Sequence, residues 1–275
     1  MSTNRILPDL NRLSVITATI MLAFSLTRVV PFNNNYLSVN LFGFVLDLGF
    51  NFKTVIAFIT AILAAAGSDW LIKGHHKEKL RESRWYSDVR HWIVPVLTSF
   101  VISVTLNNMS LGYEWWVVFG LGSFLLTMVL IAEYNVIDIG DLNHPVAVVG
   151  LTALSFALFL ILAIAVRTAG LRLYLIIPTL FTAAGFVSLR ATYLRLNGKW
   201  LFEWAVIIAL VIGQMVAGFY YLPVNPLQFG LFLLGILYAL TSFVCAYNEN
   251  RELFGLLAEP LSMLFATWLI GFLLG

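Results

Sequence analysis

Residues 201–221 decide what kind of protein this is, and they read Leu-Phe-Glu-Trp-Ala-Val-Ile-Ile-Ala-Leu-Val-Ile-Gly-Gln-Met-Val-Ala-Gly-Phe-Tyr-Tyr. Only one residue of this run is charged, Glu203 near its start. An α-helix needs about 20 mostly apolar residues to cross the hydrocarbon core of a bilayer, where the backbone must satisfy its own hydrogen bonds. The run therefore predicts a membrane-spanning helix.

The composition of the whole chain agrees with this prediction. Of its 275 residues, 60% are hydrophobic and 11% charged, and the mean hydropathy is +0.91. Soluble domains are about 45–50% apolar and about 25% charged, so a water-soluble fold is excluded. The single cysteine, Cys245, excludes a disulfide scaffold, and the net charge of +2 indicates no nucleic-acid partner. The sequence predicts an integral membrane protein.

Nine stretches of this kind occur along the chain. They predict an all-α, polytopic transmembrane helical bundle that forms one integral membrane domain over residues 1–275. The nine spans are expected at 13–30, 54–72, 92–109, 115–133, 145–166, 173–189, 201–221, 229–247 and 253–274.

The distribution of Lys and Arg predicts the orientation of these spans. If the N-terminus is cytoplasmic, only Arg28, Lys53, Arg167 and Arg172 of the 16 basic residues lie outside, which leaves 16 − 4 = 12 inside. An excess of basic residues in short loops marks the cytoplasmic side. Nine spans then place the C-terminus outside the cytoplasm. The loop from Lys73 to His91 carries much of the bias, and its Trp and Tyr residues add to the preference of its bases for anionic lipid head groups.

The segment near residues 38–52 has a different pattern. From Phe42 to Phe52, large apolar residues alternate with smaller or polar ones, and this period of two is typical of a strand. It predicts a short extracellular β-hairpin-like segment whose apolar face caps the bundle. A re-entrant or interfacial helix is the alternative.

Small residues recur every four positions in the span 201–221, at Ala205, Ala209, Gly213 and Ala217. Small residues at this spacing allow two helix backbones to approach closely. They predict a helix-packing ridge, and its partner is either another helix of the same chain or a second copy.

Glu259 is the strongest candidate for chemistry inside the membrane. A charged group at the centre of a span costs roughly 2.5–3.5 kcal/mol on insertion scales, so each one suggests a site. Glu259 lies in the last span directly before Pro260, which lacks a backbone donor and frees a carbonyl one turn back. Together with Gln214 it forms a candidate intramembrane polar site that binds a cation or relays a proton. The alternatives are a Glu259 that is protonated or paired with Arg190 or Arg195, and a Gln214 that bonds another helix.

A second candidate lies at the predicted cytoplasmic face. Glu133, Asp138, Asp141 and His144 fall within one short stretch that has no basic residue, as in an oxygen-rich metal or phosphate–metal site. Their spacing matches no zinc or calcium signature, so neither a metal nor a cofactor is assigned. The alternative is a turn followed by a cap for the helix that begins near Pro145.

Several short motifs, taken in order, resemble a known family. They are Leu41-Phe-Gly-Phe-Val-Leu-Asp47, Gly67-Ser-Asp-Trp-Leu71, Ala132-Glu-Tyr134, Val187-Ser-Leu-Arg190 and Leu194-Arg-Leu196. The chain resembles an uncharacterised family of bacterial multi-pass membrane proteins defined by a domain of unknown function. The resemblance implies a bacterial inner-membrane location, and it supplies no activity and no catalytic residue.

Three classes of function are compatible with these features. The first is a non-enzymatic scaffold, assembly or accessory component with a protein partner or a second copy. The second is a transporter or channel for a small solute, ion or lipid that uses Glu259. The third is an intramembrane enzyme that acts on a lipid-linked substrate through Glu133, Asp138, Asp141 or His144. The sequence contains no G-x-S-x-G, H-E-x-x-H or Walker motif, which favours the first class.

Overall fold

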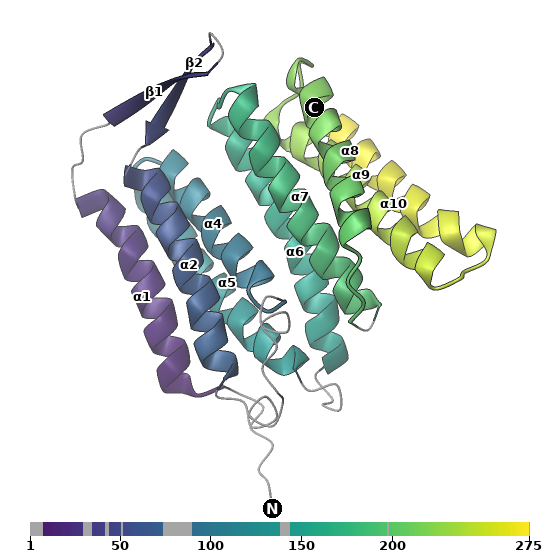
Figure 1. The fold of residues 1–275 in the computed structure, drawn as a ribbon, viewed down its shortest axis with the longest axis horizontal. Helices are drawn as coiled ribbons and strands as arrows, with labels where there is room; N and C mark the ends of the chain where they lie inside the picture. The colour runs from purple at the N-terminus through teal and green to yellow at the C-terminus, as the bar shows by residue number, and fades with distance from the viewer. Residues whose placement is uncertain are drawn as a thin grey trace, which may run out of the picture. The chain divides into compact units, whose positions relative to one another are not determined.

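The structure is a computed structural model that describes residues 8–29, 35–41, 44–50, 52–73, 90–137, 144–196 and 198–274. These residues form nine helices and two strands (Figure 1). In chain order they are α1 (Leu10–Val29), β1 (Asn35–Leu41), β2 (Phe44–Phe50), α2 (Phe52–Ile72), α4 (Ile93–Asn108), α5 (Tyr113–Val136), α6 (His144–Thr168), α7 (Leu173–Arg195), α8 (Phe202–Tyr220), α9 (Pro226–Asn248) and α10 (Leu253–Leu273).

The structure corrects the predicted count of nine spans. Seven of the described helices, α2 and α5 to α10, are long and apolar enough to cross a bilayer, as expected for a multi-pass membrane protein. The other two are shorter apolar helices, Leu10–Leu26 within α1 and Ile93–Asn108. The 16 residues of α4 extend about 24 Å at 1.5 Å per residue, whereas the hydrocarbon core is about 30 Å thick. Apolar composition predicted where helices lie but not their lengths.

The contacts of the chain divide it into two compact units, Met1–Tyr134 and Asn135–Gly275. The first unit holds α1, α2, α4, most of α5 and the two strands, and the second holds α6 to α10. The single membrane domain expected from the sequence is not tested by this division and stays a prediction.

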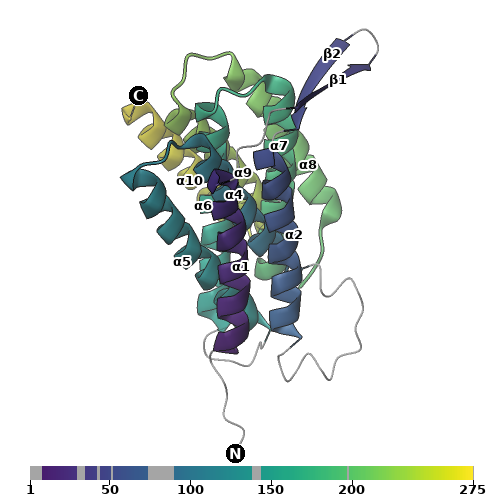
Figure 2. The same cartoon turned by 90° about the vertical axis from the view of Figure 1, so that its left-hand side faces the viewer.

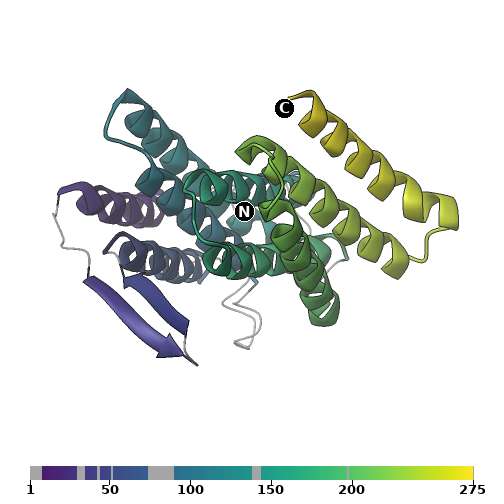
Figure 3. The ribbon, with the colours of Figure 1, turned by 90° about the horizontal axis from the view of Figure 1, so that it is seen from above.

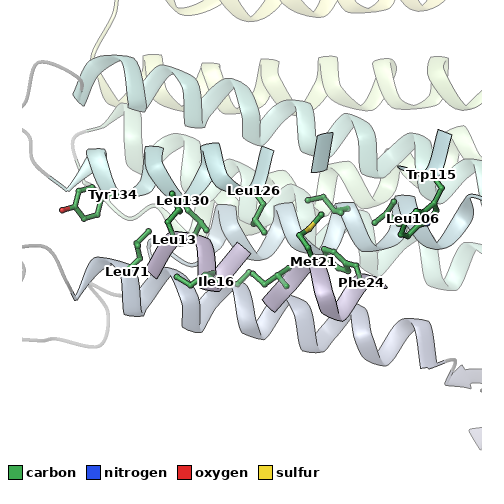
Figure 4. Packing of buried hydrophobic residues seen from close by; sticks show 13 residues of the cluster. Leu13, Ile16, Met21, Phe24, Leu71, Leu106, Trp115, Leu126, Leu130 and Tyr134 are labelled. Atoms are coloured by element: carbon green, nitrogen blue, oxygen red, sulfur yellow. The ribbon is translucent and has the colours of Figure 1, made fainter. Parts of the chain in front are cut away.

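The core of the first unit is a layer of apolar side chains between its helices (Figure 4). Leu13, Ile16 and Phe24 of α1 lie against a set from the other helices that includes Leu126 and Leu130 of α5. Helix α1 also approaches α2 closely, since a Cβ at Gly67 would lie only 2.5 Å from Ile16 Cγ2. The absence of a side chain at Gly67 therefore allows this approach.

Strands β1 and β2 precede α2 and pair with each other in antiparallel register, from Asn35 opposite Phe50 to Leu41 opposite Phe44 (Figure 2). They occupy the segment where the alternating pattern occurs. The structure describes only their backbone, so the predicted apolar face, the extracellular location and the capping role stay predictions.

In the second unit, α7 packs against both α6 and α8, and α9 packs against α6, α8 and α10. The ridge on α8 faces α7: a Cβ at Gly185 of α7 would lie 3.6 Å from Ala209 Cβ, and one at Gly213 would lie 3.6 Å from Phe181 Cδ2. The partner of the ridge is therefore a helix of the same chain. Ala205 and Ala209 are buried there, whereas Ala217 is half-buried.

Helices α9 and α10 run side by side over most of their lengths (Figure 3). The start of α9 is defined by its sequence. The side chain of Asn225 accepts from Gln228 N, the side chain of Gln228 accepts from Asn225 N, and Pro226 is the first helical residue. Gly235 and Gly271 let the two helices approach, since a Cβ at Gly235 would overlap Thr267 Oγ1 and one at Gly271 would lie 2.7 Å from Phe232 Cε1. This close contact places the end of α10 beside the start of α9.

Candidate functional site

Glu259 lies near the start of α10, directly before Pro260. Both of its carboxylate oxygens accept hydrogen bonds from Arg195, the last residue of α7: NH1 donates to Oε1 at 3.0 Å and NH2 donates to Oε2 at 2.9 Å. This two-bond geometry is the strongest pairing that the two groups can make. The hydroxyl of Tyr238 on α9 also donates to Oε1, at 3.1 Å. Glu259 thus joins three helices.

Two more charged residues from the α9–α10 turn complete what we call the Glu259 cluster: Arg195, Glu249, Arg251 and Glu259. Arg251 NH1 lies 3.5 Å from Glu259 Oε2, and Arg251 Nε lies 2.6 Å from Glu249 Oε2. Arg195 Nε also reaches Glu249 Oε1 at 3.4 Å. Two positive and two negative charges therefore balance at the ends of α7, α9 and α10.

The backbone of the turn brings these charges together. Asn250 has a φ of 53°, a left-handed conformation that Asn adopts more readily than most residues. Asn250 lies between Glu249 and Arg251. The sharp turn of the backbone at Asn250 lets the side chains of Glu249 and Arg251 contact each other. A helix C-terminus also attracts a cation, which favours Arg195 at the end of α7.

The structure has the Arg pairing that the sequence left open for Glu259, with Arg195 and not Arg190 as the partner. Because Arg195, Tyr238 and Arg251 donate to its oxygens, Glu259 lies among donors and not among the oxygen acceptors that a hard cation requires. Gln214 is not brought to this cluster. It lies exposed on α8 and forms no hydrogen bond with the residues that the structure describes.

Glu133, near the end of α5, belongs to a second polar group in the first unit. Its Oε2 lies 3.0 Å from Nδ1 of His91, and the two side chains are only 1% and 3% exposed. Arg90 Nε donates to the other ring nitrogen, His91 Nε2, at 2.7 Å. Since Nε2 accepts from Arg90, the proton of a neutral imidazole is assigned to Nδ1, from which it is donated to Glu133. We call this chain of contacts the Glu133 triad.

The other two members of the triad were not predicted from the sequence as partners of Glu133. Arg90 and His91 were interpreted only as the end of a basic loop, although they directly precede a predicted apolar span. An ionisable residue at that position was the available signal for a buried partner.

The rest of the predicted cytoplasmic-face cluster stays a prediction. Asp138 and Asp141 lie outside the described residues, and His144 begins α6 in the second unit. Most of the loop predicted to contact head groups, residues 74–89, also lies outside them. Among the residues described, no group of three or more His, Cys, Asp and Glu side chains is arranged to hold a metal ion.

Comparison with known proteins gives a single finding. The profile of a family described as "Protein of unknown function (DUF5656)" matches residues 32–274, which is most of the chain. No curated protein and no solved structure matches the chain.

Proposed function

We propose that this chain, which belongs to the DUF5656 family of proteins of unknown function, is a non-enzymatic scaffold, assembly or accessory component of a membrane. One observation supports this proposal most: Glu259, the ionisable residue best placed for intramembrane chemistry, is bound by Arg195 and Tyr238 of the same chain. Its carboxylate connects helices of the same chain, which is a structural role.

The proposal explains why a costly charge is kept in an apolar helix. An ion pair that is partly removed from water is stabilised when hydrogen bonds satisfy both partners, and removing one partner leaves the other less well compensated. Arg195 bonds Glu259 and Glu249 and also reaches Ser242 Oγ at 3.3 Å. The Glu259 cluster therefore holds α10 to α7 and α9.

Flux measurements separate this proposal from the transporter alternative. The purified chain is reconstituted in vesicles loaded with a pH-sensitive dye, and proton and potassium flux are measured with gramicidin as the positive control. We expect the chain and its Glu259→Gln variant to match protein-free vesicles. A flux that the wild type supports and Glu259→Gln abolishes would overturn the proposal in favour of transport.

A protein partner or a second copy is part of the proposed role. Helix α10 packs mainly against α9 and exposes large apolar residues, including Phe254, Leu261 and Phe265. Crosslinking in native membranes, followed by a denaturing gel, tests this part. We expect an adduct of defined mass above the 30.8 kDa chain. If no adduct forms under conditions in which a known oligomer is crosslinked, the proposed partner or second copy is contradicted.

We further propose a bacterial inner-membrane location with a cytoplasmic N-terminus, an extracytoplasmic C-terminus and anionic head groups at the loop from Lys73 to His91. The excess of basic residues on one side supports this orientation. Ser2→Cys and Gly275→Cys, each in a Cys245→Ser background, are labelled on intact cells with an impermeant maleimide. We expect labelling at position 275 and not at position 2, and the reverse pattern would refute the orientation.

A further inference from the structure

Gln214 lies on an outward side of α8 that it shares with Val206, Leu210 and Gly218. These residues recur every four positions, so they lie along one side of the helix. Val206 and Leu210 are 53% and 52% exposed, and Gln214 and Gly218 are exposed as well. The ridge that packs against α7 lies one residue earlier at each turn. We call Val206, Leu210, Gln214 and Gly218 the outer stripe.

The depth of Gln214 makes its exposed amide costly. Helix α8 runs from Phe202 to Tyr220, so its midpoint is Val211, and Gln214 lies about 4.5 Å beyond that midpoint at 1.5 Å per residue. The hydrocarbon core extends about 15 Å to either side of its centre. With α8 centred in the core, Gln214 lies about 10 Å inside it, farther from the head groups than a Gln side chain reaches. No water is available there to pair with the amide.

Other exposed polar side chains of the second unit bond their own helices. Thr182 of α7 donates to Pro178 O at 2.8 Å, and Ser262 of α10 donates to Glu259 O at 2.9 Å. Among the described residues, the amide of Gln214 has no such partner. Gln side chains in membrane helices commonly bond across to another helix. Gln214 therefore requires a polar partner on a helix that faces the outer stripe.

We propose that the outer stripe is the interface of a homodimer in which the Gln214 amides of two copies bond each other. Copies inserted in the same orientation hold Gln214 at the same depth. A twofold axis along the membrane normal then brings the two amides together, because such an interface uses the same surface of both copies. An amide carries two N–H donors and a carbonyl acceptor, so each Gln214 can donate to the carbonyl of the other. The polar groups of the two copies are thus complementary.

Gly218 allows the second copy to approach closely enough for this pairing. It lies one turn from Gln214, and no atom lies within 4 Å of a Cβ built on it. A small residue at an interface of membrane helices lets their backbones approach, and van der Waals contact and weak C–H···O bonds then hold the helices together. Leu210 and Val206 extend the contact toward the start of α8 with apolar side chains.

This inference rests on the protein partner or second copy in the proposed role, and it names that partner as a second copy bound at α8. The exposed side of α10 offers apolar side chains, such as Leu261 and Phe265. Lipid chains cover apolar side chains, but they cannot satisfy the amide of Gln214. The outer stripe, and not α10, is therefore assigned to the second copy.

The association of the full chain in lipid vesicles tests the homodimer. Chains that each carry one fluorophore are counted by photobleaching steps over a range of protein-to-lipid ratios. We expect one step at the lowest ratios and two steps at higher ratios. A single step at every ratio, under conditions in which a known membrane dimer shows two, would refute the inference.

Variants of the outer stripe identify the interface in the same assay. Gln214→Leu removes the amide and keeps an apolar side chain, so we expect dimerisation to weaken about three- to tenfold, in line with interhelical hydrogen bonds in membranes. Gln214→Asn keeps an amide and is expected to lie between Gln214→Leu and the wild type. Gly218→Leu blocks the close approach and is expected to weaken dimerisation at least as much as Gln214→Leu.

The matched control is Ser262→Ala, which removes an exposed hydroxyl from α10. This variant is expected to dimerise as the wild type does. A dimer that forms equally well in Gln214→Leu and Gly218→Leu would refute the inference. The proposed role would then still stand, because the second copy would bind at another surface.

Crosslinking locates the contact in native membranes. Gln214→Cys and Met215→Cys, each in a Cys245→Ser background, are treated with a short bifunctional thiol reagent. The two positions lie at nearly the same depth, but neighbouring residues of a helix point about 100° apart. We expect an adduct of twice the chain mass at position 214 and little at position 215. Equal adducts, or none at position 214, would refute the inference, whereas ion flux that Glu259→Gln abolishes would overturn the proposed role alone.

Discussion

Glu133 and Glu259 are both carboxylates at the ends of apolar helices, yet their surroundings differ. Glu133 is almost fully buried in the last turn of α5, where the helix dipole opposes an anion, and it contacts His91, which is bonded to Arg90. Glu259 is 32% exposed near the start of α10 and is bonded directly by the fork of Arg195. The comparison indicates that burial sets how strongly each acid depends on its partners.

The largest expected effect is at Glu133. Glu133→Ala removes the buried carboxylate that pairs with His91. Because removing one partner of a buried pair is strongly destabilising, we expect the free energy of unfolding to fall by about 3–5 kcal/mol. Unfolding by SDS in mixed micelles measures it. Glu114→Ala, at an exposed acid in the first turn of the same helix, is the control and is expected to cost below about 1 kcal/mol. Equal losses in the two variants would contradict the role of the Glu133 triad.

A smaller loss is expected at the Glu259 cluster. Arg195→Met removes two bonds to Glu259 and those to Glu249 and Ser242, but solvent partly screens these charges. We expect the free energy of unfolding to fall by about 2–3 kcal/mol in the same assay. Arg172→Met, at an exposed arginine before α7, should be within about 0.5 kcal/mol of the wild type. If Arg195→Met lost more unfolding free energy than Glu133→Ala, burial would not decide which acid depends more on its partners.

The approach of α9 to α10 supports the Glu259 cluster by geometry and not by charge. The new Cβ of Gly235→Ala would overlap Thr267 Oγ1. Overpacking of this kind typically costs about 1–3 kcal/mol, and we expect this variant to lose about 1–2 kcal/mol of unfolding free energy. Gly218→Ala in α8 is the matched control, because no atom lies within 4 Å of its Cβ. That control is expected to stabilise the helix by up to about 1 kcal/mol. If both variants are equally stable, the close packing is not needed.

The smallest effect is expected at Tyr238. Tyr238→Phe removes one hydrogen bond to Glu259 and leaves both bonds from Arg195, so we expect a loss of about 0.5–1 kcal/mol. Tyr221→Phe, at an exposed tyrosine, should change the unfolding free energy by less than about 0.5 kcal/mol. A loss at Tyr238 as large as that at Arg195 would mean that the hydroxyl, and not the guanidinium, holds Glu259.

The helices were predictable from the sequence because each apolar stretch must satisfy its backbone internally. The lengths of these helices were harder to predict. Helix α4 begins only after the turn that contains Arg90 and His91 and ends at Asn108, and both limits depend on contacts that composition does not describe. The ridge on α8 was predicted as a packing surface, but the choice between α7 and a second copy required the structure.

The partners of the two acids show where prediction from sequence ended. A pairing of Glu259 with Arg190 or Arg195 was one of the alternatives that the sequence left open. The rotation of α7 decides between these two arginines, which are five residues apart on that helix. His91 and Glu133 are 42 residues apart, and no periodic pattern links them. Their contact follows from the packing of the first unit.

The central claim is that the charge of Glu259 holds helices together. The most direct test is a double-mutant cycle of Arg195→Met and Glu259→Gln, read as unfolding free energies in mixed micelles. We predict a coupling energy of about 1–3 kcal/mol between the two residues, typical of groups in direct contact. A coupling energy near zero, with both single variants as stable as the wild type, would contradict the claim.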